Sequence, residues 1–168
     1  MKVLATFDGS EFSEIIMQQL TTIAGLAPCD FTFLAVAHEP HGRMAHITGS
    51  HPEGTGQVLG SQPVTVGVPD PEWAENKGQA IERRRAGLED YLHQLATRLP
   101  EGSNVEVVAE ISEHPDRAIV AAARERAVDL IVMATHSRGP LARALFGSVT
   151  EGVVRSGVAP VLVVHPKE

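Results

Sequence analysis

Side chains that suit phosphate binding crowd into one short stretch of the sequence. Three hydroxyls, two arginines and two glycines fall within it: Thr135, Ser137, Arg138, Gly139, Arg143, Gly147 and Ser148. Arginine can grip phosphate oxygens through paired hydrogen bonds, and glycine lets a backbone approach a ligand closely or adopt a positive φ. This composition predicts a loop that holds an anion.

A helix start reinforces that prediction. The run Ser148-Val149-Thr150-Glu151 matches a capping box, so we expect a helix to begin at Ser148. The first turn of a helix offers N–H groups and partial positive charge, which together favour an anion. The plain alternative is that Gly147-Ser148 only caps a helix.

Asp8 is a second candidate for ligand binding, because it follows an apolar run at residues 3–7. Ligands of open α/β sheets lie at the carboxyl ends of strands where the strand order reverses. In a 3-2-1-4-5 order, the first and fourth strands would flank that crevice. The Asp8 carboxylate could then accept a hydrogen bond from a ribose hydroxyl, or it could serve only the turn at Asp8-Gly9-Ser10.

The elements around these residues alternate between short apolar runs and helical patterns, as in βαβ units with a parallel sheet. Strands are predicted at 3–7, 31–37, 105–110, 130–134 and 161–164. Helices are predicted from a Ser10 cap to Ala27, over 81–99, from Pro115 to Ala127, and from Ser148 to about Arg155. We expect one domain.

Residues 38–78 break this alternation and are predicted to be an insertion, rich in Gly, Pro and His. A short strand at 64–68 could lie within it. Four histidines fall close together there, at His38, His41, His46 and His51. Their spacing matches no zinc cage, so a polar loop is the favoured interpretation over a metal site.

The composition and charge of the chain argue against some classes of binding partner. The formal net charge is −7 and no long basic run occurs, which argues against nucleic acid and anionic membranes. The cluster Arg83-Arg84-Arg85 is interpreted as a solvated helix face beside Glu82 and Glu89. A single cysteine, Cys29, permits no internal disulfide and indicates a reducing compartment, which we take to be the cytoplasm. The apolar run at the N-terminus, within 2–8, is too short for a signal peptide or a membrane span.

Several catalytic signatures are missing from the sequence. There is no Walker A motif, no dinucleotide fingerprint after a strand and no Gly-x-Ser-x-Gly elbow. His136 and Ser137 are neighbours, but adjacent loop residues usually point apart, so ligand contact is favoured over a nucleophilic pair.

Four segments together make the chain resemble the universal stress protein family. They are 7–11, the run from His114 to Met133, the loop from Thr135 to Val149, and the ending at 159–164. The resemblance implies an open five-stranded parallel sheet in the order 3-2-1-4-5 with helices on both faces, a Rossmann-like fold of the adenine nucleotide α-hydrolase type. It also implies a homodimer and, in many members, an ATP site.

That ATP site is characterised by glycine, two residues, glycine, nine residues, glycine and then Ser or Thr. The spacing is intact here, but Ala134 and Ser137 occupy the first two glycine positions. The site residues implied by this matching are Thr6, Phe7, Asp8 and Val36 around the adenosine, with Ala134, Thr135, His136, Ser137, Arg138, Gly139, Pro140, Gly147, Ser148 and Val149 around the phosphates. The expected cofactor is ATP, with or without Mg²⁺.

Three functions remain open at this point. The first is a nucleotide-binding regulatory protein of the stress response that forms a homodimer through 161–164. The second is a slow ATP hydrolase or nucleotidyl-transfer enzyme, for which Asp8 is the one candidate metal-binding acid. The third is a dimeric scaffold without a nucleotide. No general base is evident, so the regulatory function is favoured.

Overall fold

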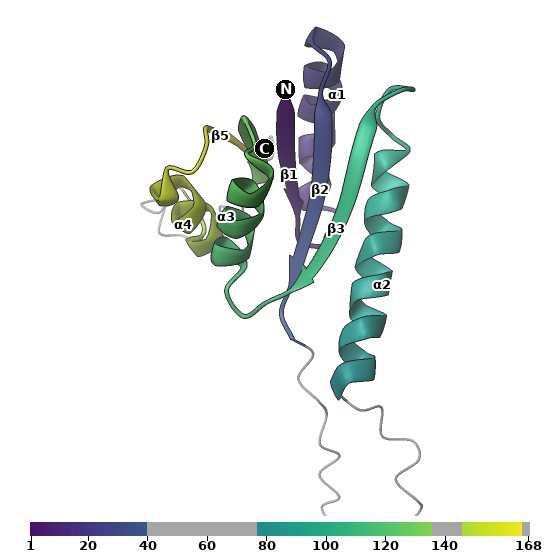
Figure 1. Ribbon diagram of the computed structural model, residues 1–168, viewed down its shortest axis with the longest axis vertical. Helices are drawn as coiled ribbons and strands as arrows, with labels where there is room; N and C mark the ends of the chain where they lie inside the picture. The colour runs from purple at the N-terminus through teal and green to yellow at the C-terminus, as the bar shows by residue number, and fades with distance from the viewer. Residues whose placement is uncertain (40–76, 136–145, 166–168) are drawn as a thin grey trace, which may run out of the picture.

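The computed structural model describes residues 1–39, 77–135 and 146–165. Five parallel strands form one sheet in the order β3-β2-β1-β4-β5, as predicted. Figure 1 shows β1, β2 and β3 side by side. The strands are β1 (Lys2–Phe7), β2 (Asp30–Ala37), β3 (Asn104–Ile111), β4 (Leu130–Ala134) and β5 (Val161–Val164). The helices are η1 (Ser13–Ile16), α1 (Met17–Leu26), α2 (Lys77–Ala96), α3 (Pro115–Arg126) and α4 (Ser148–Ser156).

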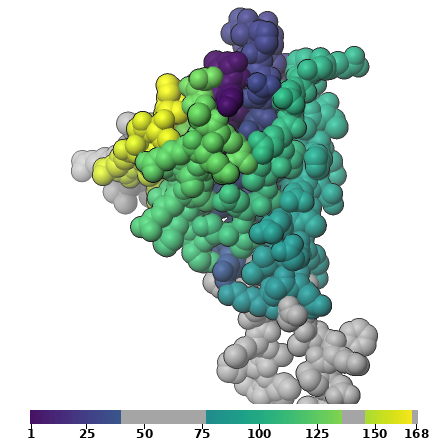
Figure 2. Space-filling view, in the orientation of Figure 1, coloured from purple at the N-terminus to yellow at the C-terminus, as the bar shows by residue number. Residues whose placement is uncertain are grey.

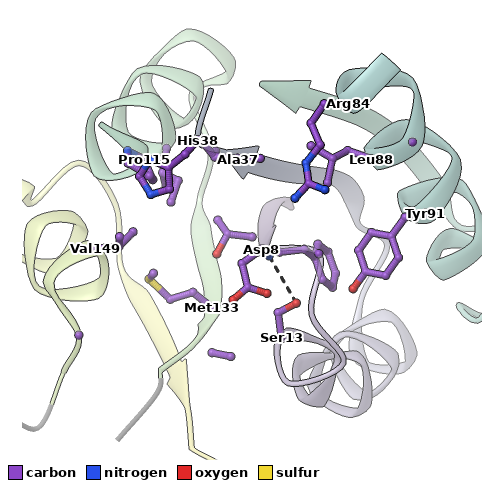
Figure 3. Close-up of a pocket in the computed structure, with 18 of the residues that line it drawn as sticks. Asp8, Ser13, Ala37, His38, Arg84, Leu88, Tyr91, Pro115, Met133 and Val149 are labelled. Atoms are coloured by element: carbon purple, nitrogen blue, oxygen red, sulfur yellow. Dashed lines mark hydrogen bonds between the residues drawn. The ribbon is translucent and has the colours of Figure 1, made fainter. Parts of the chain in front are cut away.

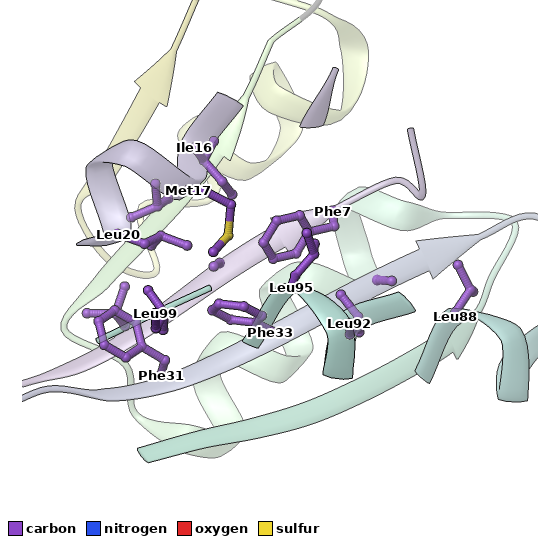
Figure 4. Packing of buried hydrophobic residues seen from close by; sticks show 14 of the residues in the cluster. Phe7, Ile16, Met17, Leu20, Phe31, Phe33, Leu88, Leu92, Leu95 and Leu99 are labelled. Atoms are coloured by element: carbon purple, nitrogen blue, oxygen red, sulfur yellow. The ribbon is translucent and has the colours of Figure 1, made fainter. Parts of the chain in front are cut away.

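Each face of the sheet has its own hydrophobic core, because alternate side chains of a strand point to opposite faces. On one face, α1 and α2 cover a cluster that includes Phe7, Phe31 and Phe33, whose ring centroids lie 5.0 Å (Phe7–Phe33) and 6.5 Å (Phe31–Phe33) apart (Figure 4). On the other face, α3 and α4 cover Leu4, Ile131 and neighbouring residues. β1 and β2 are therefore buried on both sides, as continuous apolar strands require.

Two local predictions need correction. The first α-helix begins at Met17 instead of after Ser10, because a turn and η1 come before it, with the Ser10 hydroxyl accepting from the Ser13 N–H at 3.4 Å. The helix predicted from Pro115 to Ala127 ends at Arg126; Ala127 is exposed and forms the C-cap in the left-handed region at φ 48°. Pro115 does occupy the first turn of α3, as predicted.

The boundary of the insertion also changes. Helix α2 begins at Lys77, so Lys77 and Gly78 belong to this helix. The Lys77 ammonium pairs with the Glu39 carboxylate at 2.5 Å, and this hydrogen bond raises the pKa of Lys77. The two described residues that flank 40–76 are thus held side by side. The predicted strand at 64–68 and three of the four histidines lie outside the described residues.

Replacing residues 40–76 with a short Gly/Ser linker is expected to change the thermal unfolding midpoint by less than about 2 °C. The flanking residues already meet through Lys77 and Glu39, and loop closure depends only weakly on loop length. Differential scanning calorimetry of both forms measures the effect. A large fall in the midpoint would show instead that 40–76 packs on the core.

Gly152 of α4 lies close to Asp116 of α3. A Cβ atom at this position would lie 2.9 Å from the Asp116 Cβ and 2.8 Å from its Oδ2. Gly152→Ala is therefore expected to destabilise the fold by about 1–2 kcal/mol, despite the better helix propensity of alanine. Gly25→Ala in α1 is the matched control, because a Cβ there meets nothing within 4 Å. It should stabilise the fold by about 0.5 kcal/mol in urea unfolding.

Candidate functional site

A cavity of about 1100 Å³ opens at the carboxyl ends of β1, β2 and β4. β1 and β4 are neighbours in the sheet although they are distant in sequence, so the strand order reverses between them. Ligands of doubly wound sheets bind at such a switch point. Its lining residues come from both layers of helices as well as from the strands (Figure 3).

Eight of the fourteen predicted site residues line this cavity. They are Thr6, Phe7, Asp8, Val36, Ala134, Gly147, Ser148 and Val149. Thr135 is fully buried beneath it, where its hydroxyl oxygen accepts from the Gly147 N–H at 3.3 Å. His136, Ser137, Arg138, Gly139 and Pro140 lie outside the described residues.

Asp8 has the turn role that the sequence offered, and it also lines the cavity. Its Oδ1 accepts hydrogen bonds from the Ser10 N–H at 2.9 Å and from the Ser10 hydroxyl at 2.6 Å, which fixes the turn. Gly9 holds φ +79° in that turn, a conformation that other residues rarely adopt. The Asp8 side chain nevertheless lies at the floor of the cavity, pointing toward its centre (Figure 3). The turn therefore positions the carboxylate where a ligand could reach it.

Helix α4 begins at Ser148, as predicted, but its cap differs from the predicted capping box. Gly147, not Ser148, is the N-cap, because its carbonyl accepts the first intrahelical bond, from the Glu151 N–H at 2.9 Å. Gly147 adopts φ −69° and ψ 162°, so it does not use the positive φ that glycine permits. Glycine has no side chain to cap the helix, and none does so here. Among the described residues, no side chain therefore caps the N–H groups of Ser148, Val149 and Thr150, and all three residues line the cavity.

Two walls of the cavity are apolar. Val36, Ile119 and Met133 lie on the side of α3, with Pro115 at its start. On the other side, Tyr91 stands beside Phe7, with their rings edge to face at 6.4 Å. Burial raises the pKa of Tyr91 to about 12, and its hydroxyl donates to the Ser10 carbonyl at 3.4 Å. Tyr91 therefore stays neutral at physiological pH, and a flat aromatic ligand could pack against these surfaces.

Sequence reasoning missed the contribution of α2. Arg83 and Arg84 line the cavity, together with Ala80, Gly87, Leu88 and Tyr91 from the same helix. The arginines are exposed, as the interpretation of a solvated face predicted, but the space they face is the cavity. Arg84 precedes Gly87 by three residues and Leu88 by four, and Arg83 precedes Gly87 by four. This spacing places them on one helix face, and it was the sequence signal that could have linked the arginines to the cavity.

The mouth of the cavity is polar. His38 lines it, with Nδ1 3.8 Å from the Glu113 carboxylate, and the Glu39 N–H donates to the same carboxylate at 3.2 Å. Figure 2 shows α2 (teal) and α3 (green) on the viewed face, with the end of the β2 segment (blue) visible near their lower ends.

Within the described part of the chain, no three His, Cys, Asp or Glu residues are grouped to hold a metal ion.

The fold is a doubly wound α/β fold, and its large cavity lies at the switch point of the sheet. The model of the universal stress protein family matches residues 1–165, so the chain belongs to this family. Within the described ranges, no helix is both long and apolar enough to cross a membrane.

Individual relatives agree with this assignment. Universal stress protein MJ0577 of Methanocaldococcus jannaschii is 43% identical over 53 residues, which span 32% of this chain and 33% of that protein. A solved structure of MJ0577 superposes with a TM-score of 0.67 at 24% identity, covering 99% of this chain and 96% of that one. A universal stress protein in complex with cAMP gives a TM-score of 0.59 at 18% identity, covering 98% and 96%. The structural likeness shows the shared fold.

Proposed function

We propose that this protein binds an adenine nucleotide, with ATP as the expected ligand, and acts as a nucleotide-regulated homodimer in the cytoplasmic stress response. The observation that carries the proposal is the start of α4 in the cavity. Three backbone N–H groups there have no side-chain cap, because the N-cap is glycine. Such a helix start binds phosphate through its N–H groups and its dipole.

The remaining lining suits the rest of a nucleotide. The apolar surfaces around Val36 and Met133 could hold the adenine, and Asp8 could accept from a ribose hydroxyl. The 134–149 loop, including His136, Ser137, Arg138, Gly139 and Pro140, is proposed to bind the phosphates. Mg²⁺ would enter with the phosphate oxygens, which are the ligands it prefers alongside water and carboxylates. A cavity of about 1100 Å³ has room for a ligand of this size.

Isothermal titration calorimetry with ATP, with and without Mg²⁺, tests the proposal. We expect saturable binding, with cAMP and ADP as competitors because a structural neighbour is a complex with cAMP. Native mass spectrometry of the freshly purified protein provides a second measurement, since a bound nucleotide adds a defined mass. No heat with millimolar ATP, ADP or cAMP would reject the proposal.

A further inference from the structure

One face of α2 forms a continuous wall of the cavity. The residues on this face are Ala80, Arg83, Arg84, Gly87, Leu88 and Tyr91. Their spacing follows the helical repeat, and at 1.5 Å per residue the wall is about 16 Å long. Its Tyr91 end is apolar, whereas its other end carries two arginines. The wall therefore offers a ligand both packing surface and positive charge.

Arg84 is the arginine placed to use that charge. Figure 3 shows its side chain extending from α2 toward the centre of the cavity, above Asp8. Among the described residues it has no ion-pair partner, whereas Arg85 on the next position pairs with Glu82 at 3.2 Å. Guanidinium groups bind phosphate oxygens with paired N–H donors.

The balance of charge around Arg84 favours an anionic ligand. The chain carries a formal charge of −7, yet the charged residues among the described lining are Asp8, Arg83 and Arg84. The start of α4 adds partial positive charge, and Val149 lies across the cavity from Arg84 (Figure 3). An anion between these walls is attracted from both sides.

We propose that Arg84 binds the phosphate chain of the ligand from the α2 wall, opposite the start of α4, and makes affinity rise with the number of phosphates. The inference deepens the proposed function and rests on it for the nucleotide. The two groups would bind different phosphates: the start of α4 would bind one through backbone N–H groups, and Arg84 would bind another through its side chain.

Calorimetry on wild type, Arg84→Gln and Arg84→Lys, with ATP, AMP, adenosine and inorganic tripolyphosphate, tests the inference. Arg84→Gln should weaken the binding of ATP about tenfold, because an exposed charge pair contributes modestly. The binding of AMP should weaken less than that of ATP, and the binding of adenosine should weaken less than about twofold. Arg84→Lys should recover part of the loss, since it keeps the charge without the planar fork. Arg124→Gln, an equal charge change on an exposed residue of α3 outside the cavity lining, is the control.

The probes separate failure of this inference from failure of the proposed function. If wild type binds ATP and Arg84→Gln behaves like Arg124→Gln, the role of Arg84 is overturned and the nucleotide site stands. An equal loss for adenosine and ATP would place Arg84 on the base or sugar and also overturn it. If no adenine compound binds but tripolyphosphate binds through Arg84, only the adenine nucleotide function is rejected. If tripolyphosphate also fails to bind, both are rejected.

Discussion

Gly147→Asp is expected to raise the Kd for ATP by at least about 30-fold while leaving the fold intact. Gly147 is the N-cap of α4, and its φ and ψ suit any residue. A Cβ there meets nothing within 4 Å. Aspartate is a preferred N-cap whose carboxylate accepts from the free N–H groups of the first turn. It would therefore take the hydrogen bonds proposed for a phosphate and repel the phosphate by charge.

The same substitution should slightly raise the free energy of unfolding, by a few tenths of a kcal/mol, because aspartate caps a helix better than glycine does. Loss of about 2 kcal/mol of binding without loss of stability is the distinctive result, since an unfolded variant would lose both. Calorimetric titration and urea unfolding measure the two quantities separately.

Gly147→Asn is the matched control for this experiment. Asparagine has nearly the same size and also caps helices, but it carries no charge. Its affinity for ATP should fall between those of wild type and Gly147→Asp. Unchanged affinity in the aspartate variant would mean that the phosphates do not lie at the start of α4.

The fold could be predicted from sequence because its strands and helices have strong and distinct periods. The apolar runs around Leu4, Phe33 and Ile131 became buried strands, and Leu88, Leu92 and Leu95 became the inner face of a helix. Those patterns reflect burial, which the sequence encodes residue by residue. The ends of the helices were predicted less accurately. Helix α3 ends before Ala127, and the N-cap of α4 is Gly147 instead of Ser148.

Only part of the candidate site could be predicted from sequence, because the rest depends on how the helices pack. Asp8 and the 147–149 segment follow strands, so topology alone brought them to one edge of the sheet. Arg83 and Arg84 are on an exposed helix face, and sequence patterns do not distinguish exposure to bulk solvent from exposure to a cavity. That distinction depends on where α2 packs against the sheet, which is a property of the tertiary structure.

The edge of the sheet bears on the proposed homodimer. Among the described residues, β5 pairs only with β4, so one side of its backbone has no strand beside it. All four of its residues are apolar, and it contains no lysine or proline to discourage pairing. Exposed edges of this kind are normally covered, and a two-fold axis would let two copies pair antiparallel.

Leu162→Lys is expected to weaken the proposed dimer. Leu162 is 37% exposed, whereas Val161 and Val163 pack against the core beneath α4, so a charge at 162 disturbs the edge with little harm to the fold. Lysine on an edge strand opposes pairing, and two copies would bring the charges together across the axis. We expect sedimentation equilibrium to give a dimer for wild type at micromolar concentration and a dissociation constant at least about tenfold higher for the variant. Leu26→Lys makes the same chemical change at an 80% exposed site on α1, and it should leave the dimer unaffected. A monomeric wild type at high micromolar concentration, or equal dissociation constants for the two variants, would show that β5 is not the interface.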